Sequence, residues 1–138
     1  MRRDIGIAGG LFSVAHTVIG LQVHLHGKIA LYFLPLPVAS ASAGLFQWAN
    51  WVGLVSVVII AVLVTISNDL ALRRLGLSTW KFLQRWAYPA AVLAVLHGIV
   101  YQLIEKRSYA IMTLLVFVSM AVIVLQYQGF RIRRRSER

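Results

Sequence analysis

Two histidines, His16 and His97, stand inside long apolar runs of the sequence. An imidazole in hydrocarbon is costly unless it has a partner, so ionisable residues inside membrane-spanning segments are candidates for function. His16 follows Arg3 by thirteen positions, and His97 follows Arg85 by twelve. At about 1.5 Å per helical residue, each lies roughly 18–20 Å from a basic edge. Two imidazoles at one depth on two helices are suited to ligating one haem iron from both sides.

Small residues flank both histidines at helical spacing, which predicts that each histidine shares a stripe with them. The stripes comprise Gly9, Ser13 and Gly20 around His16, and Ala90, Ala94 and Tyr101 around His97. Such stripes leave room for a flat macrocycle, but they also let helices pack closely in lipid. The side chain of Ser13 or a nearby backbone carbonyl could accept the second ring N–H and fix the tautomer.

Other interpretations of the histidines stay open. Single histidines in membranes also serve in proton relays or as hydrogen-bonding contacts between helices. His24 and His26, at the outer end of the first apolar run, are either interfacial polar residues or contacts to a haem propionate, a quinone or a metal. A dedicated metal site would want more ligands, and the chain has only four histidines and four acidic residues.

The composition indicates an integral membrane protein. The 138 residues are 59% hydrophobic and 13% charged, more apolar than a soluble domain of this size needs. Lipid leaves the helix as the only spanning element for short apolar runs. We expect an all-α membrane bundle of four helices forming a single domain over residues 1–138. The predicted spans are Ile5–His24, Trp48–Ser67, Gln84–Ile104 and Tyr109–Tyr127.

The loops between these spans predict the orientation. Eleven of the fourteen Lys and Arg residues fall at the N-terminus, in the second loop and in the C-terminal tail. The positive-inside rule therefore predicts both termini on the cytoplasmic side. Residues 27–47, which contain Pro35 and Pro37, are expected to form an interfacial loop on the outer face. We expect a short basic loop after Ser67, and a tight turn at residues 105–108 that makes the last two spans antiparallel neighbours.

Several classes of function are disfavoured. Because the chain has no cysteine, it cannot hold a disulfide, an iron–sulfur cluster, a thiolate-ligated haem or a covalently attached haem. Although the net charge is +10, the cations lie at the ends of apolar runs rather than along one face, which disfavours a nucleic-acid partner. There is no pair of carboxylates, nucleophile elbow or phosphate-binding loop that would indicate a hydrolase.

The segment from Ser67 to His97 reads SND-x3-R-x-LG-x3-W-x2-L-Q-R-x2-Y-x8-H. This string resembles a helix signature of the ferric reductase-like transmembrane domain. That superfamily includes ferric reductases, NADPH oxidases and the haem-binding membrane subunit of the bacterial periplasmic methionine-sulfoxide reductase system. Arg2-Arg3-x2-Gly6 followed by His16 is similar to another helix of the last group. Together the two matches cover about half of the chain.

The resemblance implies that His16 and His97 match the outer pair of haem ligands. Family members usually have six helices and two stacked b haems, so this chain resembles a core that lacks the first two helices. Gln84 stands where the signature often has histidine, and Arg2 stands where another inner ligand would fall. We therefore expect one haem b in the outer leaflet, with Gly9, Ser13, Gly20, Ala94 and Tyr101 beside it.

Ligation by two histidines fills both axial positions, which favours electron transfer over oxygen binding. The expected partners are the lipid bilayer and a separate redox protein or larger membrane complex, with a quinone as a further candidate. The expected location is a bacterial inner membrane or an intracytoplasmic or thylakoid membrane. The alternative is an accessory or structural subunit of a larger membrane complex that either holds no haem or holds one without a redox role. A third possibility is a quinone-site or proton-conducting protein that uses His24 and His26.

Overall fold

A computed structural model describes residues 2–23, 27–34, 41–105 and 109–136. The chain divides into two compact units, residues 1–104 and residues 105–138. Within the described residues, every regular element is a helix and there is no strand. The all-helical fold predicted from the sequence is therefore confirmed.

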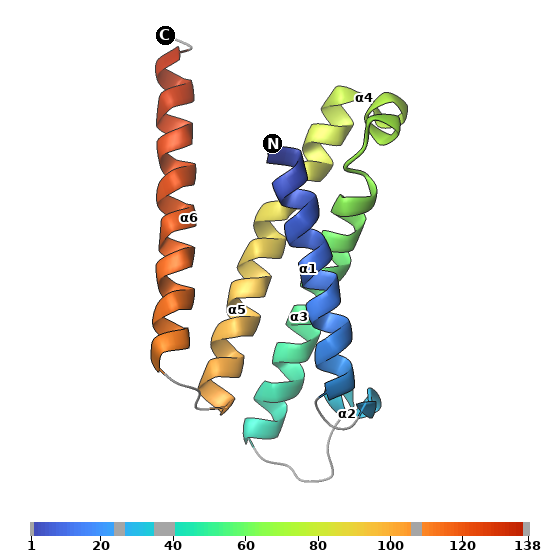
Figure 1. Ribbon diagram of the computed structural model, residues 1–138, viewed down its shortest axis with the longest axis vertical. Helices are drawn as coiled ribbons and strands as arrows, with labels where there is room; N and C mark the ends of the chain where they lie inside the picture. The colour runs from blue at the N-terminus through green and yellow to red at the C-terminus, as the bar shows by residue number, and fades with distance from the viewer. Residues whose placement is uncertain (1, 24–26, 35–40, 106–108, 137–138) are drawn as a thin grey trace. The chain divides into compact units, whose positions relative to one another are not determined.

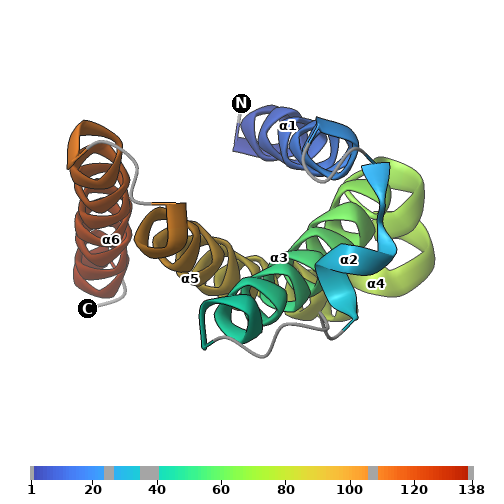
Figure 2. The same cartoon turned by 90° about the horizontal axis from the view of Figure 1, so that it is seen from below.

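The three longest helices of the first unit are α1 (Arg2–Val23), α3 (Ala41–Thr65) and α5 (Ala87–Glu105). Figure 1 shows that α1 and α5 run in the same direction and that α3 runs in the opposite one. Figure 2, which views the same unit along the helices, shows that α1 and α5 both lie beside α3. The two helices that carry His16 and His97 are therefore parallel to each other.

Three helices in the described part of the chain are long and apolar enough to cross a membrane. They are Arg3–Val23, Ala43–Thr65 and the helical segment Asp69–Ile104. A shorter apolar stretch, Met112–Val124, lies within α6. The described chain thus has the helices of a membrane protein, and the fourth crossing stays a prediction.

A glycine on α1 lets this helix approach α3 closely. Gly10 is buried, and a Cβ atom at this position would overlap a methyl group of Val64 and lie 3.3 Å from Ile60. Small residues at such crossings let two backbones come together where lipid offers no hydrophobic driving force. Gly10, rather than the neighbouring Gly9, therefore packs against α3.

The loop predicted for residues 27–47 contains more helix than the sequence suggested. It includes the short helix α2 (Ala30–Phe33), and α3 begins at Ala41, seven positions before the predicted start at Trp48. The run of small residues that precedes Trp48 is compatible with helix, so the span extends back through it. Pro35 and Pro37 lie outside the described residues.

Helix α4 (Asp69–Gln84) stands where we expected a basic loop, so that prediction was wrong. Asn68 caps the helix, because its side-chain oxygen accepts a hydrogen bond from the backbone N–H of Ala71 at 2.8 Å. Asp69 adds a negative charge to the first turn, where it interacts favourably with the helix dipole. Local capping thus makes a helix of a segment whose charges suggested a loop.

Gly76 divides α4 into two parts. Its backbone has φ 74° and ψ 158°, a conformation that is essentially restricted to glycine. We expect Gly76→Ala to lower the free energy of unfolding by about 1–3 kcal/mol, because alanine is strained there. Titration with a denaturing detergent, followed by circular dichroism, measures this loss. Gly44→Ala is the matched control, since Gly44 lies in α3 with nothing within 4 Å of an added Cβ. An equal loss in both variants would contradict the prediction.

The second unit contains the helix α6 (Tyr109–Ser136). Two of its hydroxyl side chains donate to carbonyls of their own helix, Thr113 to Tyr109 and Ser119 to Leu115. The guanidinium of Arg131 lies 5.9 Å from the centre of the Tyr127 ring. Residues 106–108 are not among the described ones, so the predicted tight turn and the single four-helix domain stay predictions.

Candidate functional site around His97

The imidazole of His97 is fixed by the backbone of α3. Its Nδ1 atom lies 2.8 Å from the carbonyl oxygen of Ala49. A carbonyl oxygen can only accept a hydrogen bond, so Nδ1 carries the proton and donates it. In the neutral ring the lone pair is then on Nε2, which makes no hydrogen bond in the described part of the chain. Histidines that bind metals usually have this arrangement, with one ring nitrogen held and the other available.

Gly53 provides the space for this ring. A Cβ atom built at Gly53 would lie 2.6 Å from Nδ1 and 2.8 Å from Cε1 of His97. Real Cβ atoms do not approach other atoms so closely, so any larger residue at position 53 would displace the imidazole. The glycine therefore determines where the His97 ring can lie.

A chain of hydrogen bonds surrounds the end of the site that is remote from α4. Tyr101 packs against the His97 ring at 4.8 Å between ring centres and donates its hydroxyl to Asn50 Oδ1 at 2.7 Å. The buried Asn50 in turn lies 3.4 Å from the backbone carbonyl of Tyr32 in α2. The Tyr32 hydroxyl donates to the carbonyl of Gly20 in α1 at 3.1 Å. These contacts link all four helices of this end.

The stripe of residues around His97 packs against α3. Ala90 is buried, and its carbonyl accepts a hydrogen bond from Ser56 at 2.9 Å, while His97 and Tyr101 bond to the first turns of α3. Ala94, on the same stripe, is exposed. On α5, therefore, the interpretation as a helix-packing face holds for most of the stripe.

The stripe around His16 is packed less closely, and its contact with another helix is the bond that Gly20 accepts from Tyr32. His16 is exposed and makes no hydrogen bond within the described residues. Added Cβ atoms at Gly9 and Gly20 would meet nothing within 4 Å. The hydroxyl of Ser13 donates to the carbonyl of Gly9 at 2.9 Å and makes no bond to His16. Open space thus lies beside this face of α1.

The contacts with α3 also relate the depths of the two histidines. Gly10 packs against residues 60–64 of α3, and His97 packs against residues 49–53. Because α1 runs opposite to α3, His16 lies six positions further from the α4 end than Gly10 (Figure 1). At about 1.5 Å per residue, this leaves His16 roughly 6–8 Å closer than His97 to the end occupied by α4. The two histidines, which the sequence predicted at one depth, are thus offset by roughly one helical turn.

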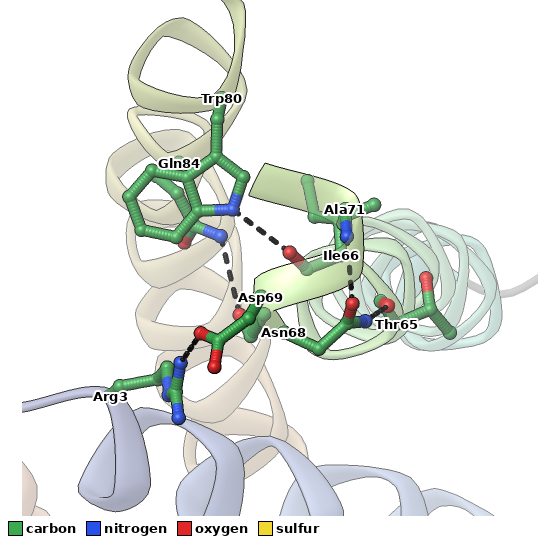
Figure 3. Close-up of polar contacts among 9 residues, drawn as sticks. Arg3, Thr65, Ile66, Asn68, Asp69, Ala71, Trp80 and Gln84 are labelled. Atoms are coloured by element: carbon green, nitrogen blue, oxygen red, sulfur yellow. Dashed lines mark hydrogen bonds and ion pairs between the residues drawn. The ribbon is translucent and has the colours of Figure 1, made fainter. Parts of the chain in front are cut away.

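At the α4 end, Gln84 occupies the position where the ferric reductase-like signature often has a histidine. Its side-chain nitrogen donates to the hydroxyl of Ser67 at 3.2 Å, and Trp80 Nε1 donates to the carbonyl of Ile66 at 2.9 Å (Figure 3). Arg3 of α1 pairs with Asp69 of α4 at 2.5 Å in the same view. Hydrogen bonds and an ion pair thus hold α4 to α1 and to the residues that follow α3.

Sequence reasoning missed Ala49, Asn50 and Gly53, which hold His97 and Tyr101 in place. One pattern could have revealed them, since Asn50 and Gly53 stand only three positions apart in an apolar run. His24 and His26 lie outside the described residues. Within the described residues, no three His, Cys, Asp or Glu side chains gather to hold a metal ion.

Comparison with known proteins adds no relative, since no family model, no curated protein and no solved structure significantly matches the chain. The membrane-protein character therefore comes from the helices themselves. The likeness to the ferric reductase-like domain stays a prediction from the residues that carry it.

The buried phenol of Tyr32 predicts a pH effect. Burial raises the pKa of Tyr32 above its ordinary value of 10.0. The folded protein therefore holds this proton more tightly than the unfolded chain, so stability is complete below pH 10 and falls as the pH rises above it. Detergent unfolding at pH values on either side of 10 should show this fall, and Tyr32→Phe should weaken it. Tyr109→Phe is the control, because Tyr109 is 90% exposed; an equal effect of both substitutions would argue against the prediction.

Proposed function

We propose that this chain is a membrane cytochrome that holds one haem b through His97, with His16 as the second axial ligand. The observation that carries the proposal is the His97 imidazole, which is held at Nδ1 by the Ala49 carbonyl and has an available Nε2. Open space beside Gly9 and Gly20 on α1 supports it, because a macrocycle next to a ligating helix needs room. When bound, a haem with two histidine ligands supplies one-electron transfer with no open position at iron.

The residues of the site would then have distinct roles. The Ala49 carbonyl fixes the tautomer of His97, and Gly53 makes room for its ring. Tyr101 packs against this ring and donates its own hydroxyl to Asn50. From a level roughly one helical turn away, His16 would reach the same iron only after a rotation of its own side chain or a shift of α1, while His97 stays bonded to Ala49. Gly9, Ser13 and Gly20 lie on the α1 face that the macrocycle would approach, and Ala94 is exposed on α5.

The distribution of Lys and Arg along the chain supports a membrane location and an orientation. The chain would lie in a bacterial inner membrane or an internal membrane, with both termini on the cytoplasmic side and the site in the outer leaflet. Electrons would pass to or from a separate redox protein, a larger membrane complex or a quinone. The likeness of Ser67–His97 to the ferric reductase-like signature agrees with this role.

The test is the haem content of the full chain, purified from membranes of haem-supplied cells. We expect about one haem per chain, with the reduced-minus-oxidised absorption of a six-coordinate b-type centre. Protein that retains its helical circular dichroism but contains no haem would overturn the proposal.

The second candidate function is an accessory subunit without haem, and a specific observation favours it. The hydrogen bond from His97 to Ala49 crosses the contact between α5 and α3, as does that from Ser56 to Ala90. Both would serve as polar contacts between packed helices even if no ligand were bound. Purification in fixed stoichiometry with a larger assembly, together with the absence of haem, would favour this function.

A further inference from the structure

Helix α4 and its C-cap residue Arg85 carry four cations without an ion-pair partner in the described part of the chain, two on each side of the break at Gly76. We call these four residues together the basic face of α4: Arg73, Arg74, Lys81 and Arg85. All four residues are exposed, and none takes part in an ion pair within the described residues. The carboxylate of α4, Asp69, is already paired with Arg3 of α1. The basic face therefore has an uncompensated charge of four.

Large apolar side chains are exposed on the same helix. Leu70 and Leu77 are each 57% exposed, and Phe82 is 59% exposed. Leucine and phenylalanine beside Lys and Arg on one helix are typical of helices that lie in the interface of a membrane. This composition suits a surface with both hydrocarbon and negative charge.

The structure holds α4 at the end of the membrane-spanning helices. It begins four positions after the end of α3 and ends three positions before the start of α5. The bonds from Trp80 to Ile66 and from Gln84 to Ser67 tie its second half to the end of α3 (Figure 3). In Figure 1 the first half of α4 is seen nearly end-on, so it lies across the direction of the spans. With α1, α3 and α5 crossing a membrane, this end of the unit would lie at the level of the lipid headgroups.

We propose that the basic face of α4 binds the headgroups of anionic phospholipids, while Leu70, Leu77 and Phe82 enter the boundary of the acyl chains. The charge selects the occupant, because four cations without carboxylate partners complement a phosphate-rich surface. Each cation near such a surface strengthens binding about fivefold. This proposal does not depend on the presence of haem.

A spin label can report the depth of α4, since the chain has no cysteine of its own. The full chain carrying Leu77→Cys is labelled and reconstituted into phosphatidylcholine vesicles with increasing fractions of phosphatidylglycerol. Accessibility to oxygen and to a water-soluble nickel reagent gives the depth of the label. We expect the label to move from water into the interface as phosphatidylglycerol increases, and to return when the salt concentration is raised.

Removal of two charges tests the role of the basic face. Arg73→Gln with Arg74→Gln should weaken binding to the anionic surface about 25-fold, so that the label stays in water at phosphatidylglycerol fractions that bring the unsubstituted helix into the interface. Arg73→Lys with Arg74→Lys keeps the charge and should leave the transition in place. A label that is equally deep in phosphatidylcholine alone, or that stays in water in all vesicles, overturns the proposal. A transition unchanged by the glutamine substitutions does so too.

Discussion

Replacement of His97 by alanine should abolish haem binding in the proposed cytochrome. The substitution removes the Nε2 ligand together with the Nδ1–H that the Ala49 carbonyl holds. The chain has no cysteine, and its other histidines are His16 on α1 and two that lie outside the described residues, so α5 carries no second histidine to replace His97. Haem per chain, measured by the absorbance of the extracted pyridine complex, should fall from about one to near zero.

Two companion variants sharpen this result. Tyr101→Phe keeps the aromatic ring against His97 and removes only the hydroxyl bonded to Asn50, so haem content should stay close to that of the wild type. His16→Ala should convert a six-coordinate, low-spin spectrum into a five-coordinate, high-spin one, or remove the haem. A low-spin spectrum that survives His16→Ala would show that another group is the second ligand. Full haem content in His97→Ala would refute the site itself.

Gly53→Ala should weaken haem binding about 10–100-fold. Residue 53 would act only indirectly, through its contact with the His97 ring. The new methyl group would occupy the place of the ring, 2.6 Å from Nδ1, and would push the imidazole away from the Ala49 carbonyl. The ring would then lose the hydrogen bond that orients it. Titration of the haem-free protein with haem, followed at the absorption maximum, measures the change in affinity.

The control for Gly53→Ala is Gly44→Ala on the same helix, where an added Cβ meets nothing within 4 Å. It makes the same chemical change in α3 and should leave haem affinity unaltered. If Gly53→Ala binds haem as tightly as the wild type, then the position of the His97 ring in this structure is not the one that binds. If the protein is instead an accessory subunit, Gly53→Ala lowers only the free energy of unfolding.

The sequence alone determined the helical class of this protein and the approximate position of its long helices. Lipid leaves an apolar run of about 20 residues no alternative to helix, so composition and length suffice for α1, α3 and α5. Local signals could also have revealed α4, since Asn68 and Asp69 form a helix start and Gly76 allows the break. Our expectation of a loop there gave too much weight to its charges.

Only the tertiary structure decided which partners the key side chains meet. The sequence identified His97 and Tyr101 as candidates, but it could not show that Ala49 and Asn50, about fifty positions away, would bond to them. Nor could it show that Gly10 packs on α3 while Gly9 faces open space. Helical periodicity places residues on faces of one helix, whereas the neighbour of each face depends on how separate helices pack against one another. That choice depends on contacts between residues far apart in the chain, and no local pattern encodes it.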